Sequence, residues 1–148
     1  MNFRHHSCGF PDADQRPGVY FGAFSFYIET MKVNLEEKLS QIQEHWTPHI
    51  IAELNGQQVK LAKLKGEFVW HKHDNEDELF YVIKGQLQIL FEDKTVHLGP
   101  GEMLVVPKGV SHKPVAEEEV EILLFEPAST LNTGDAKSSL TQRELKKI

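Results

Sequence analysis

The sequence predicts an all-β domain, a barrel or sandwich of short strands, preceded by one short helix. Its 148 residues are the usual size of a single domain. From residue 50 onward, apolar and polar residues alternate in short runs, as they do in strands with one buried face. Turn-forming residues separate these runs at short intervals, at Asn55-Gly56, Lys84-Gly85, Asp93-Lys94, Gly99-Pro100-Gly101 and Lys108-Gly109.

Residues 1–30 differ in character from the rest of the chain. They begin polar and interrupted by proline, and then become aromatic in residues 18–28, the most apolar run. This run is too short to span a bilayer. Two interpretations remain open: residues 1–30 add a strand that packs on the barrel, or they form an extension that the fold does not need.

Residues 31–49 are expected to contain one amphipathic helix. Asn34 can cap the first free amides, and Glu37 can reach back to complete a capping box. Apolar side chains then recur at helical spacing, and Thr47-Pro48 is expected to end the helix. The apolar positions are Leu35, Leu39, Ile42 and Trp46.

Residues 50–127 are expected to form the barrel, and residues 128–148 a polar C-terminal tail. Asn55-Gly56 predicts a hairpin that pairs Ala52 with Val59 and, further from the turn, Ile50 with Leu61. The later strands are expected at residues 67–73, 78–83, 86–92, 95–98, 102–106, 111–115 and 120–126. Lys84-Gly85 predicts a second hairpin, between the strands that begin at residues 78 and 86.

The stretch Gly66–Gly85 contains the first candidate metal ligands. His71 and His73 are two residues apart in a predicted strand, so their side chains lie on one face. In the second hairpin, Glu78 shares the apolar face of that strand with Phe80 and Val82. A buried carboxylate is costly unless a positive charge neutralises it, and a divalent cation held jointly with the two histidines would do so.

His112 strengthens this interpretation, because it follows the turn at Lys108-Gly109 and begins another strand. Three imidazoles and one carboxylate suit Fe, Mn, Ni, Zn, Co or Cu as divalent ions, and the residues do not choose among them. Four protein ligands on an octahedral ion leave two positions for water, substrate or oxygen.

The same residues resemble the two motifs of the cupin superfamily. The first cupin motif is Gly, five residues, His-x-His, three or four residues, Glu, six residues and Gly. Here Gly66 stands one residue closer to His71, and the remainder of the motif matches. The second motif is matched by Gly101, Pro107, Gly109 and His112, with Ala116 in place of its final Asn.

This resemblance implies a double-stranded β-helix, or jelly-roll barrel, over about residues 50–127. It also implies that His71, His73, Glu78 and His112 are the metal ligands. More narrowly, the chain resembles the small single-domain cupins called mannose-6-phosphate isomerase-like, a label that describes similarity and does not establish a substrate. The resemblance further implies a homodimer, and the outward apolar residues Leu79, Tyr81 and Leu90 offer a face to cover.

Composition limits the possible functions further. The net charge is −6 and no Lys/Arg cluster is present, so nucleic acid is not an expected partner. The single cysteine, Cys8, cannot form a disulfide framework, and a cytoplasmic location is the default expectation. Three functions stay open: a metal-dependent oxidoreductase or isomerase acting on a small molecule, a non-catalytic module that binds or senses a small ligand, and a barrel whose metal is only structural.

Overall fold

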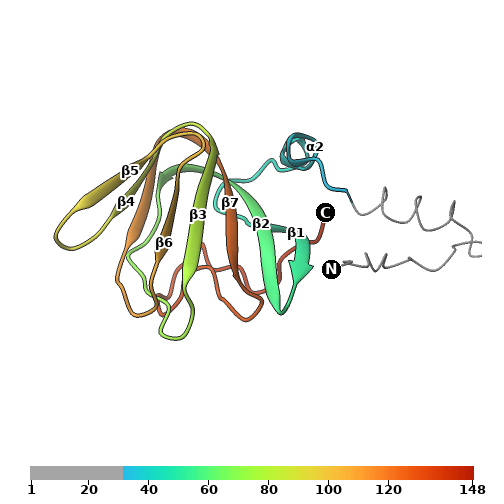
Figure 1. Cartoon of the computed structure of the whole chain (residues 1–148). Helices are drawn as coiled ribbons and strands as arrows, with labels where there is room; N and C mark the ends of the chain where they lie inside the picture. Colours follow the sequence, from blue (N-terminus) through green and yellow to red (C-terminus); the bar gives the residue numbers. More distant parts are fainter. Residues whose placement is uncertain (1–31) are drawn as a thin grey trace, which may run out of the picture. The chain divides into compact units, whose positions relative to one another are not determined.

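One short helix and a seven-stranded sheet make up residues 32–148, the part of the chain that the computed structural model describes (Figure 1). The elements are α2 (Leu35–Ser40), β1 (His49–Leu54), β2 (Gln57–Glu67), β3 (Glu78–Lys84), β4 (Leu87–Leu90), β5 (Thr95–Leu98), β6 (Met103–Val106) and β7 (Lys113–Pro127). The predicted all-β double-stranded β-helix with one short helix is confirmed. Residues 1–30 lie outside the described residues, so neither interpretation of them is tested.

The long strand β7 joins the two halves of the barrel. Its second half lies between β2 and β3 in a layer ordered β1-β2-β7-β3-β6. Its first half pairs with β4, which pairs in turn with β5. In Figure 1, β4 and β5 accordingly lie on the opposite side of the barrel from β1. Successive side chains of a strand point to opposite faces, and the inward side chains of both halves of the barrel meet in one core.

The predicted hairpin at Lys84-Gly85 is wrong. β3 pairs with β6 and β7, and β4 pairs with β5 and β7, so the chain passes from one half of the barrel to the other between them. Gly85 adopts a φ of +89°, and a side chain there would stand 2.8 Å from the Glu119 carbonyl oxygen. A glycine turn can lead either into a hairpin or into a strand in the other half of the barrel. The local sequence does not distinguish the two.

The inward face predicted from that hairpin is nevertheless correct for most of its residues. Alternation fixes which side chains share a face within one strand, whichever strand lies alongside. The side chains of Glu78, Phe80, Val82, Leu87 and Ile89 are all buried. Phe91 is only partly buried, because β4 ends at Leu90.

Two strand boundaries and one hairpin register also differ from expectation. The strand expected at residues 67–73 ends at Glu67, and the strands expected at 111–115 and 120–126 are the single strand β7. In the Asn55-Gly56 hairpin, Ala52 pairs with Val59 as predicted. A bulge at Ile51 then moves the register by one residue, so His49, not Ile50, pairs with Leu61.

The helix begins as predicted but is shorter. Asn34 Oδ1 accepts a hydrogen bond from the Glu37 amide at 3.2 Å. The helix ends at Ser40, before Thr47-Pro48. Beyond it, Trp46 has a φ of +60° and donates its amide to the Lys63 carbonyl, so it is buried by an irregular turn.

The outer face of the β1-β2-β7-β3-β6 layer is apolar, and α2 covers only part of it. Leu39 and Ile42 pack there on Ile51 and Leu61. Leu79 and Tyr81 lie on the same face, next to Val105 and Met103 of β6. Leu90 belongs to β4 in the other half and so forms no patch with them.

The segment after β7 contains no strand or helix of its own, yet it returns to the barrel. Thr133 is fully buried, and the Ile148 amide bonds the Ile50 carbonyl at 3.0 Å. Residues 128–148 are therefore bound along the barrel, because their backbone groups find partners that composition does not reveal. Within the described range, no helix has the length and apolarity needed to cross a membrane.

Candidate metal centre

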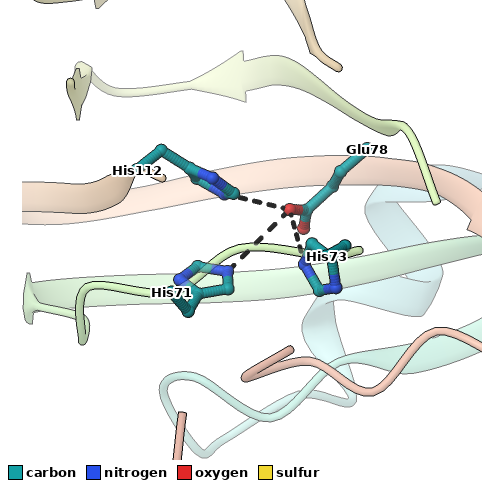
Figure 2. Close-up of side chains that lie close together, drawn as sticks. All are labelled: His71, His73, Glu78 and His112. Atoms are coloured by element: carbon teal, nitrogen blue, oxygen red, sulfur yellow. Dashed lines mark hydrogen bonds and ion pairs between the residues drawn. The ribbon is translucent and has the colours of Figure 1, made fainter. Parts of the chain in front are cut away.

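Four side chains predicted to be ligands come together inside the barrel (Figure 2). One ligand atom from each of His71, His73, Glu78 and His112 lies within 4.8 Å of all the others. All four residues are buried, with exposed fractions of 0–4%. Around an ion with bonds of roughly 2.1 Å, neighbouring ligand atoms lie about 3 Å apart and opposite ones about 4 Å apart. The spacing of the four atoms therefore fits a metal ion.

The backbone brings these residues together from three places in the sequence. His71 and His112 form an isolated antiparallel bridge, in which each amide bonds the other residue's carbonyl at 3.0 and 2.9 Å. His73 follows two residues later, and its carbonyl accepts the amide of Gly109 at 2.7 Å. Glu78 is the first residue of β3 and points inward with the alternation of that strand. The turn at Lys108-Gly109 thus places the third histidine opposite the first two.

Backbone carbonyls select the tautomer of two histidines. His71 Nδ1 lies 3.0 Å from the Val69 carbonyl oxygen, and His112 Nδ1 lies 3.0 Å from that of Val110. A carbonyl can only accept a hydrogen bond, so each Nδ1 carries the proton. In the neutral rings, Nε2 then presents a lone pair to the centre of the group. Metal-binding histidines are held in this way in many proteins.

Two of the three Nε2 atoms have no hydrogen-bond partner in the described part of the protein. His71 Nε2 and His73 Nε2 are buried without a hydrogen bond. Glu78 Oε2 lies 3.2 Å from His73 Nε2, 3.2 Å from His112 Nε2 and 4.0 Å from His71 Nε2. One carboxylate oxygen therefore faces three ring nitrogens, and lone pairs that face each other repel unless a cation or a proton lies between them.

The titration of the group reflects this arrangement. Burial, with the neighbouring His112, lowers the pKa of His71 to about 4. Burial would also lower the pKa of His73, but the Glu78 carboxylate, 3.2 Å away, outweighs burial and raises it. Burial opposes ionisation of Glu78, yet the neighbouring His112 and His73 rings lower its pKa to about 2. The carboxylate is therefore charged and favours a positive charge among the three rings.

The donor set fits a divalent transition metal. Imidazole nitrogens suit Fe, Co, Ni, Cu and Zn, and a carboxylate oxygen extends the range to Mn. An ion would bind the unpaired Nε2 atoms and neutralise the charged carboxylate. The fixed tautomers of His71 and His112 already point their Nε2 lone pairs toward it.

The C-terminal segment supports the loop that carries His71 and His73. The Asp135 carboxylate accepts the Lys72 amide at 3.0 Å, and the Asp135 amide donates to the Lys72 carbonyl at 3.1 Å. Gly134 lies so close to Lys72 and His73 that a side chain at this position would overlap the Lys72 carbonyl. Sequence reasoning missed this contact, because nothing in a Ser/Thr-rich segment identifies its partner.

A buried ion pair lies beside the metal ligands and was also missed. Lys60 Nζ donates to Glu126 Oε1 at 2.7 Å, and the two side chains are 1% and 2% exposed. Burial, with the charge of Glu78 adding to it, raises the pKa of Glu126 to about 7. Alternation could have revealed it, since Glu126 ends the inward series of Val120, Ile122 and Leu124.

Two cavities adjoin the group. An inner cavity of about 30 Å³ is lined by apolar core residues together with His71, Glu78, Glu126 and Asn132. An open outer pocket of about 860 Å³ is lined by His71, Trp70, Phe91 and Val110, among others. Because His71 lines both, the metal ligands adjoin a small cavity inside the barrel and a larger pocket outside.

Known proteins share this fold and much of this sequence. A family model described as the cupin domain matches residues 55–126. A cupin-2 domain-containing protein from Shewanella frigidimarina is 50% identical with a TM-score of 0.67, over 68% of this chain and 98% of that one. The Neisseria meningitidis protein NMB1881 is 37% identical with a TM-score of 0.61, over 66% of this chain and 99% of that one.

A further relative is the uncharacterized protein YdbB of Bacillus subtilis. It is 40% identical over 81 residues, which are 54% of this chain and 72% of that protein. None of these three descriptions names a ligand or an activity.

Proposed function

The chain belongs to the cupin superfamily, and from its interior ligand group we propose that it binds a divalent transition metal and, through it, a small molecule. The single observation that carries this proposal is the Glu78 carboxylate oxygen, which faces three imidazole nitrogens in a buried site. A divalent ion held by His71, His73, Glu78 and His112 would remove the repulsion among these lone pairs. Such an ion polarises a bound oxygen ligand or exchanges electrons with it.

The surroundings of the group favour a small ligand. The inner cavity of about 30 Å³ has room for roughly two water molecules, so a sugar ring does not fit there. The bulk of a larger ligand would lie in the outer pocket, where Trp70 and Phe91 offer apolar contact. These dimensions give no support for the substrate suggested by the mannose-6-phosphate isomerase-like label.

Cobalt(II) titration of the metal-depleted protein tests the proposal. Visible absorption bands of Co(II) are expected to saturate at one ion per chain. Glu78→Gln is expected to lose this saturation, because a neutral amide cannot balance the charge of the ion. His45→Ala serves as the control, since His45 pairs with the surface residue Glu119 at 2.8 Å. Equal cobalt spectra for Glu78→Gln and the control would contradict the proposal.

Two functions differ in whether a ligand can reach the metal ion. An oxidoreductase or isomerase needs a ligand that reaches the ion, and the outer pocket beside His71 provides an approach. A non-catalytic binding or sensing protein with a structural metal is the alternative, and the near-complete burial of the four ligands favours it. Exchange of bound cobalt by excess zinc separates the two: a structural ion exchanges over hours, and an accessible one within minutes.

We also propose that the protein forms a homodimer in the cytoplasm, through the outer face of β3 and β6. Met103 and Val105 are 62% and 46% exposed on an edge strand of the layer. Their cross-strand neighbours Tyr81 and Leu79 extend the apolar face that α2 leaves open. Sedimentation of wild type and Val105→Lys measures this: the wild type is expected at twice the mass of the variant, and a monomeric wild type would contradict it.

A further inference from the structure

A lysine and a glutamate lie inside the barrel in addition to the metal ligands. Lys60 lies on the inward face of β2 with Ala62 and Leu64, and Glu126 lies on the inward face of β7 with Leu124. Removing two charges from water costs free energy that their attraction does not fully return, and apolar residues of similar size are often as stable or more so. The barrel core therefore does not need this pair for stability.

Lys60 occupies only one of the two carboxylate oxygens. It donates to Glu126 Oε1, whereas Glu126 Oε2 is buried without any hydrogen-bond partner. Glu126 lines the inner cavity together with the metal ligands His71 and Glu78. An unpaired buried acceptor is costly, so a hydrogen-bond donor in this cavity is expected to bind there.

The charges around the cavity indicate what else the ligand must offer. Three neutral imidazoles and the Glu78 carboxylate leave one positive charge in excess on a divalent ion. Above its pKa of about 7, Glu126 is ionised, so Lys60 and Glu126 cancel each other and do not change this balance. A ligand with one anionic oxygen compensates the excess charge, and a hydroxyl group near that oxygen supplies the donor that Glu126 lacks.

We propose that Glu126, held in place by Lys60, is a positioning residue that selects small hydroxy acids by accepting a hydrogen bond from the hydroxyl next to their metal-binding oxygen. This inference rests on the proposed metal-binding function and names the ligand class of the same site. The inner cavity of about 30 Å³ admits a hydroxyl group, and the remainder of the acid lies toward the outer pocket that His71 also lines.

A matched pair of probes tests the selection. Glycolate and acetate differ by one hydroxyl group, and both bind metal ions through a carboxylate. Titrated at pH 8, where Glu126 is ionised, into the Co(II)-loaded full-length protein, each is followed by the change in visible absorption. Wild type is expected to bind glycolate about tenfold or more tightly than acetate, the effect of one hydrogen bond to a charged group.

The decisive variant replaces both partners, Lys60→Met with Glu126→Leu, so that no unpaired charge stays in the core. It is expected to keep one cobalt per chain and to bind glycolate and acetate equally. The control makes the same changes at Lys65 and Glu118, which pair at 3.0 Å on the same two strands but are exposed. This control is expected to keep the tenfold preference.

The measurements separate failure of the metal site from failure of the selection. A wild type that binds no cobalt overturns the proposed function and this inference together. A wild type with full cobalt content but equal affinities overturns only the inference. A double variant that keeps the preference for glycolate also overturns it, because the hydroxyl is then recognised elsewhere.

Discussion

The buried Lys60–Glu126 pair predicts opposite outcomes for breaking the pair and for replacing it. Glu126→Leu leaves the Lys60 ammonium uncompensated in a site where it is 1% exposed, 2.7 Å from the oxygen it has lost. Loss of one partner of a buried pair costs about 3–5 kcal/mol of unfolding free energy. Adding Lys60→Met removes the remaining charge, so the double variant is expected within about 1 kcal/mol of wild type or above it.

Urea unfolding of the metal-free protein measures both variants, because bound metal would add its own contribution to the stability. The exposed pair Lys65–Glu118 provides the comparison: Glu118→Leu is expected to cost less than about 1 kcal/mol. The reasoning is refuted if Glu126→Leu costs no more than Glu118→Leu. It is also refuted if the second substitution, Lys60→Met, fails to restore the stability lost in the first.

Two further predictions concern the proton on Glu126 and the loop that carries the histidines. Burial first, and then the charge of Glu78, raises the pKa of Glu126 from 4.5 to about 7, so the native carboxyl keeps its proton where the unfolded chain has lost it. The contribution of Glu126 to the stability of the metal-free protein should therefore fall by about 3 kcal/mol between pH 4.5 and 7. The lowered pKa of His71 acts in the opposite direction over this range, so the fall is measured as the change with pH in the difference of urea unfolding free energy between wild type and the Lys60→Met, Glu126→Leu variant. Gly134→Ala displaces the Lys72 carbonyl and should weaken cobalt binding about tenfold or more, whereas Gly101→Ala, also at positive φ but with open space around it, should not. Equal cobalt affinities for the two glycine variants would contradict the role of the C-terminal segment.

Much of the site could be predicted because its residues follow strand periodicity. His71 and His73 share a face by their spacing alone, and Glu78 faces inward with Phe80 and Val82. These placements survive an incorrect hairpin, since the side-chain period within a strand does not depend on its neighbours. His112 was included because it follows the turn at Lys108-Gly109, and the cupin motifs then connected it to the other three.

Strand partners and irregular segments could not be predicted from local sequence. Gly85 looks like a hairpin glycine, but it carries the chain along β7, from β3 beside its second half to β4 beside its first, and only the tertiary fold decides between the two. The bulge at Ile51 has no turn residue to mark it. Asp135 contacts Lys72 from a segment with no periodicity, so its role depends on long-range packing.

Lys60 and Glu126 are a different case, because their alternation was visible. Both occupy inward positions, but charged residues are usually assigned to solvent on composition alone. Like Glu78, a charged residue at an inward position of an otherwise apolar strand indicates a buried polar group that needs a partner.

Elemental analysis of the purified protein tests the central claim most directly, with His71→Ala and Glu78→Gln measured alongside wild type after the same metal repletion. Three imidazole nitrogens face one buried carboxylate oxygen, and two of them have no hydrogen bond, which predicts one transition-metal ion per wild-type chain and a large loss in both variants. Equal and low metal contents in all three proteins would contradict the account.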